Sequence, residues 1–220
     1  MDWLAVHFQE DLDWNIKALL KSFVLSSTYQ QSAAASPEQL EIDPNNIYLS
    51  RASRIRLSAE QVRDQALAVS DLLSDKMYGP SVMPPQPEGV WQVIRNVLRW
   101  EESKGEDRYR RALYTFWRRS SPYPSFISFD SPSRELCVSR RINTNTPLQA
   151  LTTLNDTVYV EAARALGQLM MEQEAPSVKA KIEYGYKKTS LQTASASTLA
   201  LLAEEYNSYL TYYKENPVLA

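Results

Sequence analysis

The chain has 220 residues, of which 44% are hydrophobic and 23% charged, a composition that is typical of folded globular proteins and excludes wholesale disorder. One cysteine and one histidine exclude intrachain disulfides and Cys/His metal clusters. The formal net charge of -2 is unevenly distributed, since residues 1–50 carry -5, residues 51–141 carry +5 and residues 142–220 carry -2. Fourteen of the 15 arginines lie in the middle segment. This charge excess is too small for a typical nucleic-acid binder, so nucleic acid is not an expected partner.

The first 50 residues are predicted to contain one helix and one loop. Apolar residues at helical spacing predict a helix over 13–28 with Asp13 as its N-cap. Polar residues with Ser-Pro and Asp-Pro steps predict a surface loop over 30–46. The N-terminus lacks the basic start and cleavage site of a secretory signal. No apolar run approaches the about 20 residues that a membrane span needs.

The middle of the chain is predicted to contain a helix, a long loop and a short ribbon. Ser58 and Gln61 match a capping box and predict a second helix, which buries Val62, Ala66, Val69 and Leu73. Four prolines between positions 80 and 87 predict that 79–107 is a long Pro-rich loop. Residues 108–130 predict one short β ribbon, because Ala112, Tyr114 and Phe116 alternate with Leu113, Thr115 and Trp117.

The last third of the chain is predicted to be helical. Thr146 and Gln149 form a second capping box with Pro147 at the first helical position, and Asp156 caps a continuation to about 170. Two further helices are expected near 177–188 and 197–214, the last burying Leu199, Leu202, Tyr206, Leu210 and Tyr213. The predicted fold is therefore mainly α: a single irregular helical domain over residues 1–220. Both ends read as cut, so we expect a fragment of a larger multidomain protein.

Residues 129–147 are the densest polar stretch and lead directly into a helix N-terminus, which favours anions. Arginine forks suit carboxylate, sulfate or phosphate groups. The candidate ligand-binding residues are Arg118, Arg119, Asp130, Arg134, Glu135, Arg140, Arg141 and Asn145. The alternative for the same residues is a loop braced by Arg–carboxylate pairs. No metal site is predicted.

The same stretch carries a family resemblance. The run Phe129 to Leu151, with Arg134-Glu135-x-Cys137, Arg140-Arg141 and Thr144-Asn145-Thr146-Pro147, resembles the domain of unknown function at the C-terminal end of planctomycete-type cytochrome c proteins. Matching stretches include Asp2-Trp3-Leu4-Ala5 and Gly79-Pro80-Ser81-Val82. The resemblance implies an exported protein in an extracytoplasmic compartment, periplasmic or cell envelope. It also implies upstream domains of the same polypeptide as partners, with haem expected only there and no cofactor in this chain. It supplies no catalytic residues.

Two functions are compatible with these observations. The first, which we prefer, is a non-catalytic interaction or scaffold module of an exported, haem-associated multidomain protein that binds an anionic polysaccharide. The second is a carboxylate-based hydrolase of sulfated polysaccharide, in which two of Asp107, Asp130 and Glu135 face one cleft. In that case Arg118, Arg140 and Arg141 would hold sulfate or uronate groups. The sequence leaves the question of an enzyme open.

Overall fold

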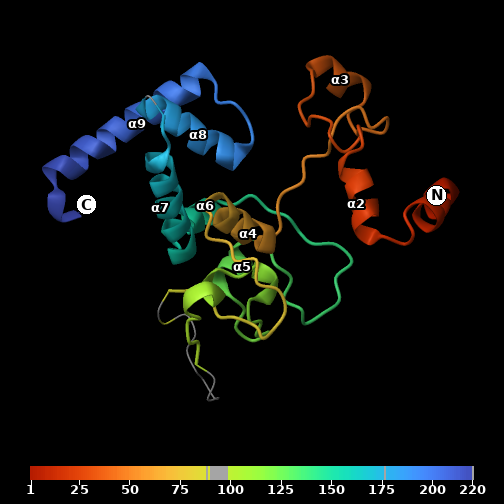
Figure 1. Ribbon diagram of the computed structural model, residues 1–220, viewed down its shortest axis with the longest axis horizontal. Coiled ribbons are helices and arrows are strands. Elements are labelled where there is room, and N and C mark those ends of the chain that lie inside the picture. The colour runs from red at the N-terminus through yellow and green to blue at the C-terminus, as the bar shows by residue number, and fades with distance from the viewer. Residues whose placement is uncertain (88, 90–98, 176, 220) are drawn as a thin grey trace. The chain divides into compact units, whose positions relative to one another are not determined.

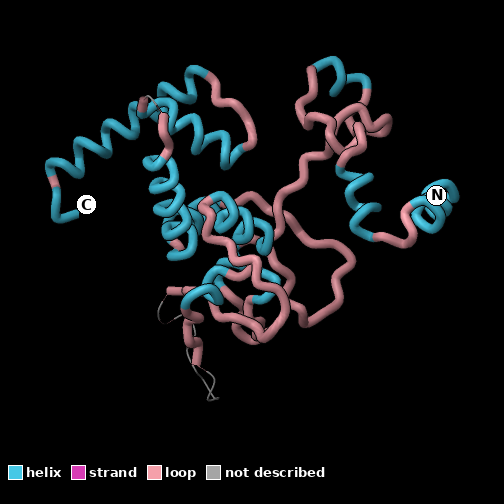
Figure 2. The backbone as a smooth tube through the Cα atoms, in the orientation of Figure 1, coloured by secondary structure: helices cyan, strands magenta, loops and turns pink. Residues whose placement is uncertain are grey.

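The computed structural model describes residues 1–87, 89, 99–175 and 177–219, and within them the chain consists of helices and loops with no strand (Figures 1 and 2). The prediction of a mainly α fold is confirmed. The contacts divide the chain into two compact units, Met1–Arg56 and Leu57–Ala220. The prediction that residues 1–220 form one domain stays a prediction.

Unit 1 begins with α1 (Asp2–Val6), a π-helical turn (His7–Asp11) and α2 (Ile16–Val24). The helix predicted over 13–28 is therefore shorter than expected. Asp13 and Trp14 have positive φ angles of 45° and 58° and cannot belong to a helix. Asn15 is the N-cap instead, because its Oδ1 accepts the Ala18 N–H at 3.1 Å.

Unit 1 also contains α3 (Pro37–Ile42), which lies inside the segment predicted to be a loop. Ser36 and Gln39 form a capping box, with N···O distances of 3.2 Å and 3.0 Å, and Pro37 occupies the first helical position. A helix this short has too few turns to show a hydrophobic period, so only its capping residues could have indicated it.

Unit 2 begins with α4 (Ala59–Val69), and the predicted capping box of Ser58 and Gln61 is confirmed. The predicted buried face is wrong. Val62, Ala66, Val69 and Leu73 are only partly buried, whereas Ala59, Arg63 and Leu67 are fully buried. The buried face of α4 is therefore displaced by about one residue from the predicted apolar face, and its centre is occupied by the side chain of Arg63.

The remaining α-helices of unit 2 are α5 (Pro124–Ser128), α6 (Pro147–Asn155), α7 (Thr157–Glu172), α8 (Val178–Ser190) and α9 (Ala196–Glu215). Helices α6 to α9 lie close to the predicted helices, whereas α5 was not predicted. α4 packs on α5 and α7, while α8 joins α7 to α9 (Figure 1). One core cluster is made by Ala59, Ala112, Tyr123 and Phe126, and the other by Ile182, Ala194 and Leu199.

The apolar face predicted for α9 is only partly correct. Leu199 is buried and Tyr206 packs against the second cluster, but Leu202, Leu210 and Tyr213 are exposed. The C-terminal half of α9 extends past the helices that could cover it (Figure 1). Within the described residues, no helix combines the length and the hydrophobicity that crossing a membrane requires.

The β ribbon predicted over 108–130 is wrong. The segment forms two 3₁₀ turns, Gly105–Tyr109 and Ala112–Tyr114, followed by α5. Among the described residues, its strand-like features are two isolated parallel bridges, from Arg110 to Ser74 and from Thr115 to Val82. The two bridges are eight positions apart on one segment, from 74 to 82, but five on the other, from 110 to 115, so the two segments cannot keep one ladder register between them.

The Pro-rich loop is held firmly over 79–87, where it has no regular secondary structure. Pro84 and Pro85 are among the most deeply buried side chains. Trp100 Nε1 donates to the Pro84 carbonyl at 2.8 Å, and the Tyr123 hydroxyl donates to the Pro85 carbonyl at 2.6 Å. The rest of the predicted loop includes residues 88 and 90–98, which lie outside the described residues.

Candidate functional site

The predicted site residues centre on the segment between α5 and α6, residues 129–146, which we call the charged loop. This loop is unusually long, because loops without secondary structure rarely have more than about 12–15 residues. It projects from the helices of unit 2 as an open excursion (Figures 1 and 2). Residues 133–143 are all exposed, and Leu136 and Ile142 are 80% and 75% exposed. The middle of the loop is therefore available to a ligand.

Asp130 closes the base of the charged loop. One of its carboxylate oxygens, Oδ2, accepts hydrogen bonds from the backbone N–H and the hydroxyl of Thr144, both at 2.7 Å. Gln149 Nε2 donates to the same oxygen at 3.3 Å. Asp130 has a positive φ of 59°, a conformation that Asp tolerates better than most residues. This carboxylate thus joins the two ends of the loop.

Arg134 and Trp117 fix the first part of the charged loop. The Arg134 guanidinium lies over the Trp117 ring, 4.5 Å from its centroid, and Trp117 Nε1 donates to the Ser133 carbonyl at 3.3 Å. Trp117 itself packs against the first core cluster. A cation–π contact and a hydrogen bond therefore connect this exposed arginine to the core.

Arg141 fixes the last part of the charged loop through a two-pronged ion pair with Glu60 on α4. The N···O distances are 2.6 Å and 3.1 Å. Burial raises the pKa of the Glu60 carboxyl, but hydrogen bonds from Arg141, Ser58 and the backbone, together with the charge of Arg141, lower it by more, so the net shift is downward. Glu60 in turn raises the pKa of Arg141. Both groups are charged at neutral pH, so the pair holds the charged loop to α4 and does not act as a proton donor.

The structure does not bring the eight predicted residues together at one point. Arg118 Nε donates to the Ser120 hydroxyl at 3.0 Å. The side chains of Arg119, Glu135, Arg140 and Asn145 are exposed. Arg141 lines a cavity in the described residues. The prediction that these residues bind a ligand stays a prediction.

Sequence reasoning missed the cavity that Arg141 lines. It has a volume of about 370 Å³, and Glu60, Asp64, Arg111 and Arg141 are its charged lining residues. Asp64 accepts from Arg111 Nε at 3.0 Å and from the Ala112 N–H at 2.6 Å. The spacing of Glu60 and Asp64, four residues apart on one face of a helix, was the available signal. The charges of the two arginines and the two carboxylates that line this cavity therefore balance.

Two buried arginines were also missed. Arg63 donates to the carbonyls of Arg110 at 2.7 Å and Arg108 at 3.0 Å, and both Arg63 and Arg110 are 1% exposed. Arg110 donates to the carbonyls of Tyr78 and Pro80. Arg63 thus supplies donors to carbonyls of residues 108–110 and Arg110 to carbonyls of residues 78–80, which favours the bracing interpretation for part of the arginine excess.

The carboxylates of the hydrolase alternative lie in separate surroundings. Asp107 pairs with Lys76 at 2.7 Å, and this hydrogen bond is the main reason why the pKa of Asp107 is lowered. Asp130 closes the charged loop, and Glu135 is exposed. Within the described residues, no three His, Cys, Asp or Glu side chains lie close enough together to hold a metal ion.

The fold and the site together define a mainly helical protein in which arginines brace irregular segments and one long charged loop remains exposed. Over residues 1–206 the chain matches the family described as PSD1, protein of unknown function (DUF1553), and it belongs to that family. No curated protein and no solved structure matches it. The recognition of a domain of unknown function is thus confirmed, while the link to planctomycete-type cytochrome c proteins stays a prediction.

Proposed function

We propose that this protein is a non-catalytic interaction module that binds an acidic polysaccharide through the charged loop. The observation that carries the proposal is the loop itself, which is pinned by Asp130, Arg134 and Arg141 but exposed between them. Holding a binding loop at its base lowers the entropy lost when a ligand orders it. Such a loop is suited to recognition.

The arginines of the loop favour an anionic ligand. Arg140 is exposed, and Arg134 is an exposed residue whose guanidinium lies over the Trp117 ring. Guanidinium groups bind sulfate and carboxylate groups through paired hydrogen bonds. The exposed side chains of Leu136 and Ile142 add an apolar surface for the C–H face of a sugar ring.

The wider setting of the proposal rests on the family resemblance of the sequence. On that basis we expect an extracytoplasmic protein whose partners include upstream domains of the same polypeptide, with haem in those domains and no cofactor in this chain. The hydrolase alternative has less support, because Asp107 pairs with Lys76, Asp130 accepts from Thr144 and Glu135 is exposed.

The proposal is tested by the affinity of the 220-residue chain for chondroitin sulfate, with neutral dextran as a control. We expect the sulfated polymer to bind and dextran not to bind, and the affinity to fall as salt increases because exposed charges are screened. Replacing Arg134 and Arg140 together with Gln is expected to weaken binding by about tenfold or more.

Arg164→Gln is the matched control, because Arg164 is exposed on α7 and lies outside the charged loop. It should retain the affinity of the unchanged protein. Equal binding of dextran, or a double variant that binds chondroitin sulfate as well as the Arg164 control does, would contradict the proposal.

A further inference from the structure

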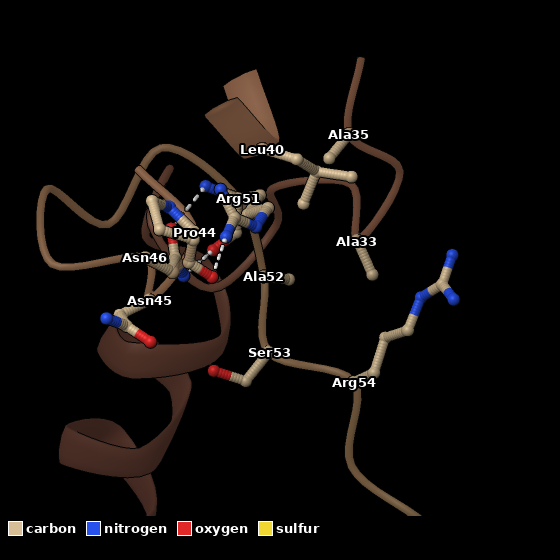
Figure 3. A pocket seen from close by; sticks show the side chains of 10 residues that line it. All are labelled: Ala33, Ala35, Leu40, Pro44, Asn45, Asn46, Arg51, Ala52, Ser53 and Arg54. Atoms are coloured by element: carbon tan, nitrogen blue, oxygen red, sulfur yellow. Dashed lines mark hydrogen bonds between the residues drawn. The ribbon is translucent and has the colours of Figure 1, made fainter. Parts of the chain in front are cut away.

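Unit 1 contains a cavity of about 400 Å³ beside α3, and its charged lining residues are Arg51 and Arg54 (Figure 3). Arg51 Nη2 already donates to the carbonyls of Asp43 at 2.8 Å and Pro44 at 3.0 Å. Arg54 extends on the opposite side of the cavity (Figure 3). The two cations therefore offer no common point to a ligand.

Unit 2 contains a smaller cavity, of about 250 Å³, where α5 and α6 meet. Sites for drug-sized ligands have about 300–1,000 Å³, so this cavity suits a smaller molecule. Its polar lining comes from the two helices and from Asp156, which follows α6. Its apolar walls are the side chains of Pro87, Pro124, Leu148 and Leu151.

Among the described residues that line this cavity, Asp156 alone is charged, and it is 8% exposed. Its Oδ1 accepts the Val158 N–H at 2.9 Å, whereas Oδ2 has no hydrogen-bond partner in the described part of the chain. Oδ2 is not one of the partnerless polar atoms that are sealed from solvent, so it retains accessible surface. A carboxylate oxygen with free lone pairs is thus available to a ligand.

The charge of Asp156 is only partly compensated. Arg63 is the cation whose charge acts on Asp156, but its guanidinium donates to the carbonyls of Arg108 at 3.0 Å and Arg110 at 2.7 Å. Burial raises the pKa of Asp156 by more than the Val158 hydrogen bond and the Arg63 charge lower it. A cation that enters the cavity would stabilise the charged carboxylate.

The other polar side chains of the lining have already used protons within the protein. The Ser128 hydroxyl donates to the Pro124 carbonyl at 3.3 Å, and the Thr152 hydroxyl donates to the Leu148 carbonyl at 2.8 Å. A hydroxyl has one proton, so these two oxygens can only accept a hydrogen bond from a ligand. Asn155 Nδ2 likewise donates within α6. The lining therefore favours a ligand that donates hydrogen bonds.

We propose that this cavity binds a primary ammonium group borne on a short aliphatic chain, with the ammonium at Asp156 Oδ2 and the chain against Leu148 and Leu151. An ammonium has three donors and no acceptor, which matches a lining that offers lone pairs. The site goes beyond the polysaccharide function, since its ligand has the opposite charge and it shares no residue with the charged loop. Either proposal can fail without the other.

The test is a titration of the 220-residue chain with n-butylammonium, followed by calorimetry and by NMR shifts of the backbone amides. 1-Butanol has a similar length without the charge, and butyrate reverses the charge. We expect saturable binding of n-butylammonium alone, with shifts at Thr152 and Val158. Asp156→Asn keeps an N-cap acceptor but loses the charge, so it should weaken n-butylammonium binding by about tenfold or more.

Asp75→Asn is the matched control, because Asp75 is an exposed carboxylate of unit 2 that does not line the cavity. It should bind n-butylammonium unchanged. Leu151→Ala shortens an apolar wall at an exposed position, and should weaken n-butylammonium more than methylammonium, which has no chain to lose contact. Equal binding of 1-butanol, shifts that do not saturate, or an Asp156→Asn variant that binds like the Asp75 control would overturn the proposal.

Discussion

At the scale of single residues, the most consequential feature is the use of buried arginines as backbone donors. Arg63 spans the carbonyls of Arg108 and Arg110 from inside α4, and burial lowers its pKa although nearby acidic groups oppose this shift. A planar guanidinium can reach two carbonyls at once, which a lysine ammonium on a flexible stem does poorly. Arg63 therefore ties the irregular segment 105–114 to a helix.

Loss of Arg63 should be strongly destabilising. We expect Arg63→Ala to lower the free energy of unfolding by about 3 kcal/mol, because two buried carbonyls lose their donor and a cavity forms. Arg63→Lys should recover only part of this loss. Urea denaturation measures both changes. Arg119→Ala, at an exposed arginine, should stay within about 0.5 kcal/mol of the unchanged protein. Equal effects at Arg63 and Arg119 would show that the buried bridge does not stabilise the fold.

At the scale of secondary-structure elements, side-chain caps decide where the helices begin. Asp156 separates α6 from α7, and its Oδ1 accepts the Val158 N–H at 2.9 Å. Burial raises the pKa of Asp156, and the hydrogen bond from Val158 and the charge of Arg63 only partly oppose this. The cap is therefore geometrically favourable but carries a charge that its surroundings disfavour.

Asp156 gives a pH-dependent prediction. Because its pKa is higher in the folded than in the unfolded chain, the folded chain holds the proton more tightly, and stability falls as pH rises from 3.8 through the folded-state pKa. Asp156→Asn keeps an N-cap acceptor without the charge, so its stability relative to the unchanged protein should improve as pH rises from 3.8 through the folded-state pKa. Urea denaturation at several pH values measures this difference.

Asp156→Ala is the companion variant, because it removes the cap together with the charge. It should be about 1 kcal/mol less stable than Asp156→Asn at every pH. If the stability difference between Asp156→Asn and the unchanged protein did not vary with pH, the carboxyl would not be perturbed as described.

At the scale of the whole molecule, the apolar core is confined to unit 2. Every fully buried apolar side chain among the described residues follows position 57, whereas in residues 1–56 only Asp43 is buried. The apolar face of α2, including Ile16 and Leu20, is exposed. Since burial of apolar surface is the main stabilising term, the two units should differ in local stability.

Amide hydrogen exchange on the 220-residue chain tests this difference. Amides in α4 and α7, which pack against each other, should exchange most slowly, because they open only when unit 2 unfolds. Amides in α2 and α3 should exchange faster, because few buried contacts oppose their local opening. Protection in α2 equal to that in α7 would contradict this account.

Much of the helical framework could be predicted from the sequence. Ser58 with Gln61 and Asp156 mark helix starts that the structure reproduces, because capping depends on side chains within three residues of the cap. The prediction of a β ribbon over 108–130 failed, because alternation of apolar residues over a short segment does not by itself decide between a strand and a loop. The alternation at 112–117 indicated a strand, but a strand needs a partner in continuous register, and residues 74–82 meet this segment only at two bridges whose spacing differs between the two segments.

For the candidate site, the sequence by itself determined which residues are concentrated in 129–147 and that they precede a helix. Only the tertiary structure decided their roles. It turned Asp130 toward Thr144, paired Arg141 with Glu60 and buried Arg63 and Arg110 in the interior. The physical reason is that these partners lie far apart in the chain. Whether an arginine binds a carboxylate, a carbonyl or solvent depends on which distant group the fold brings within hydrogen-bonding distance.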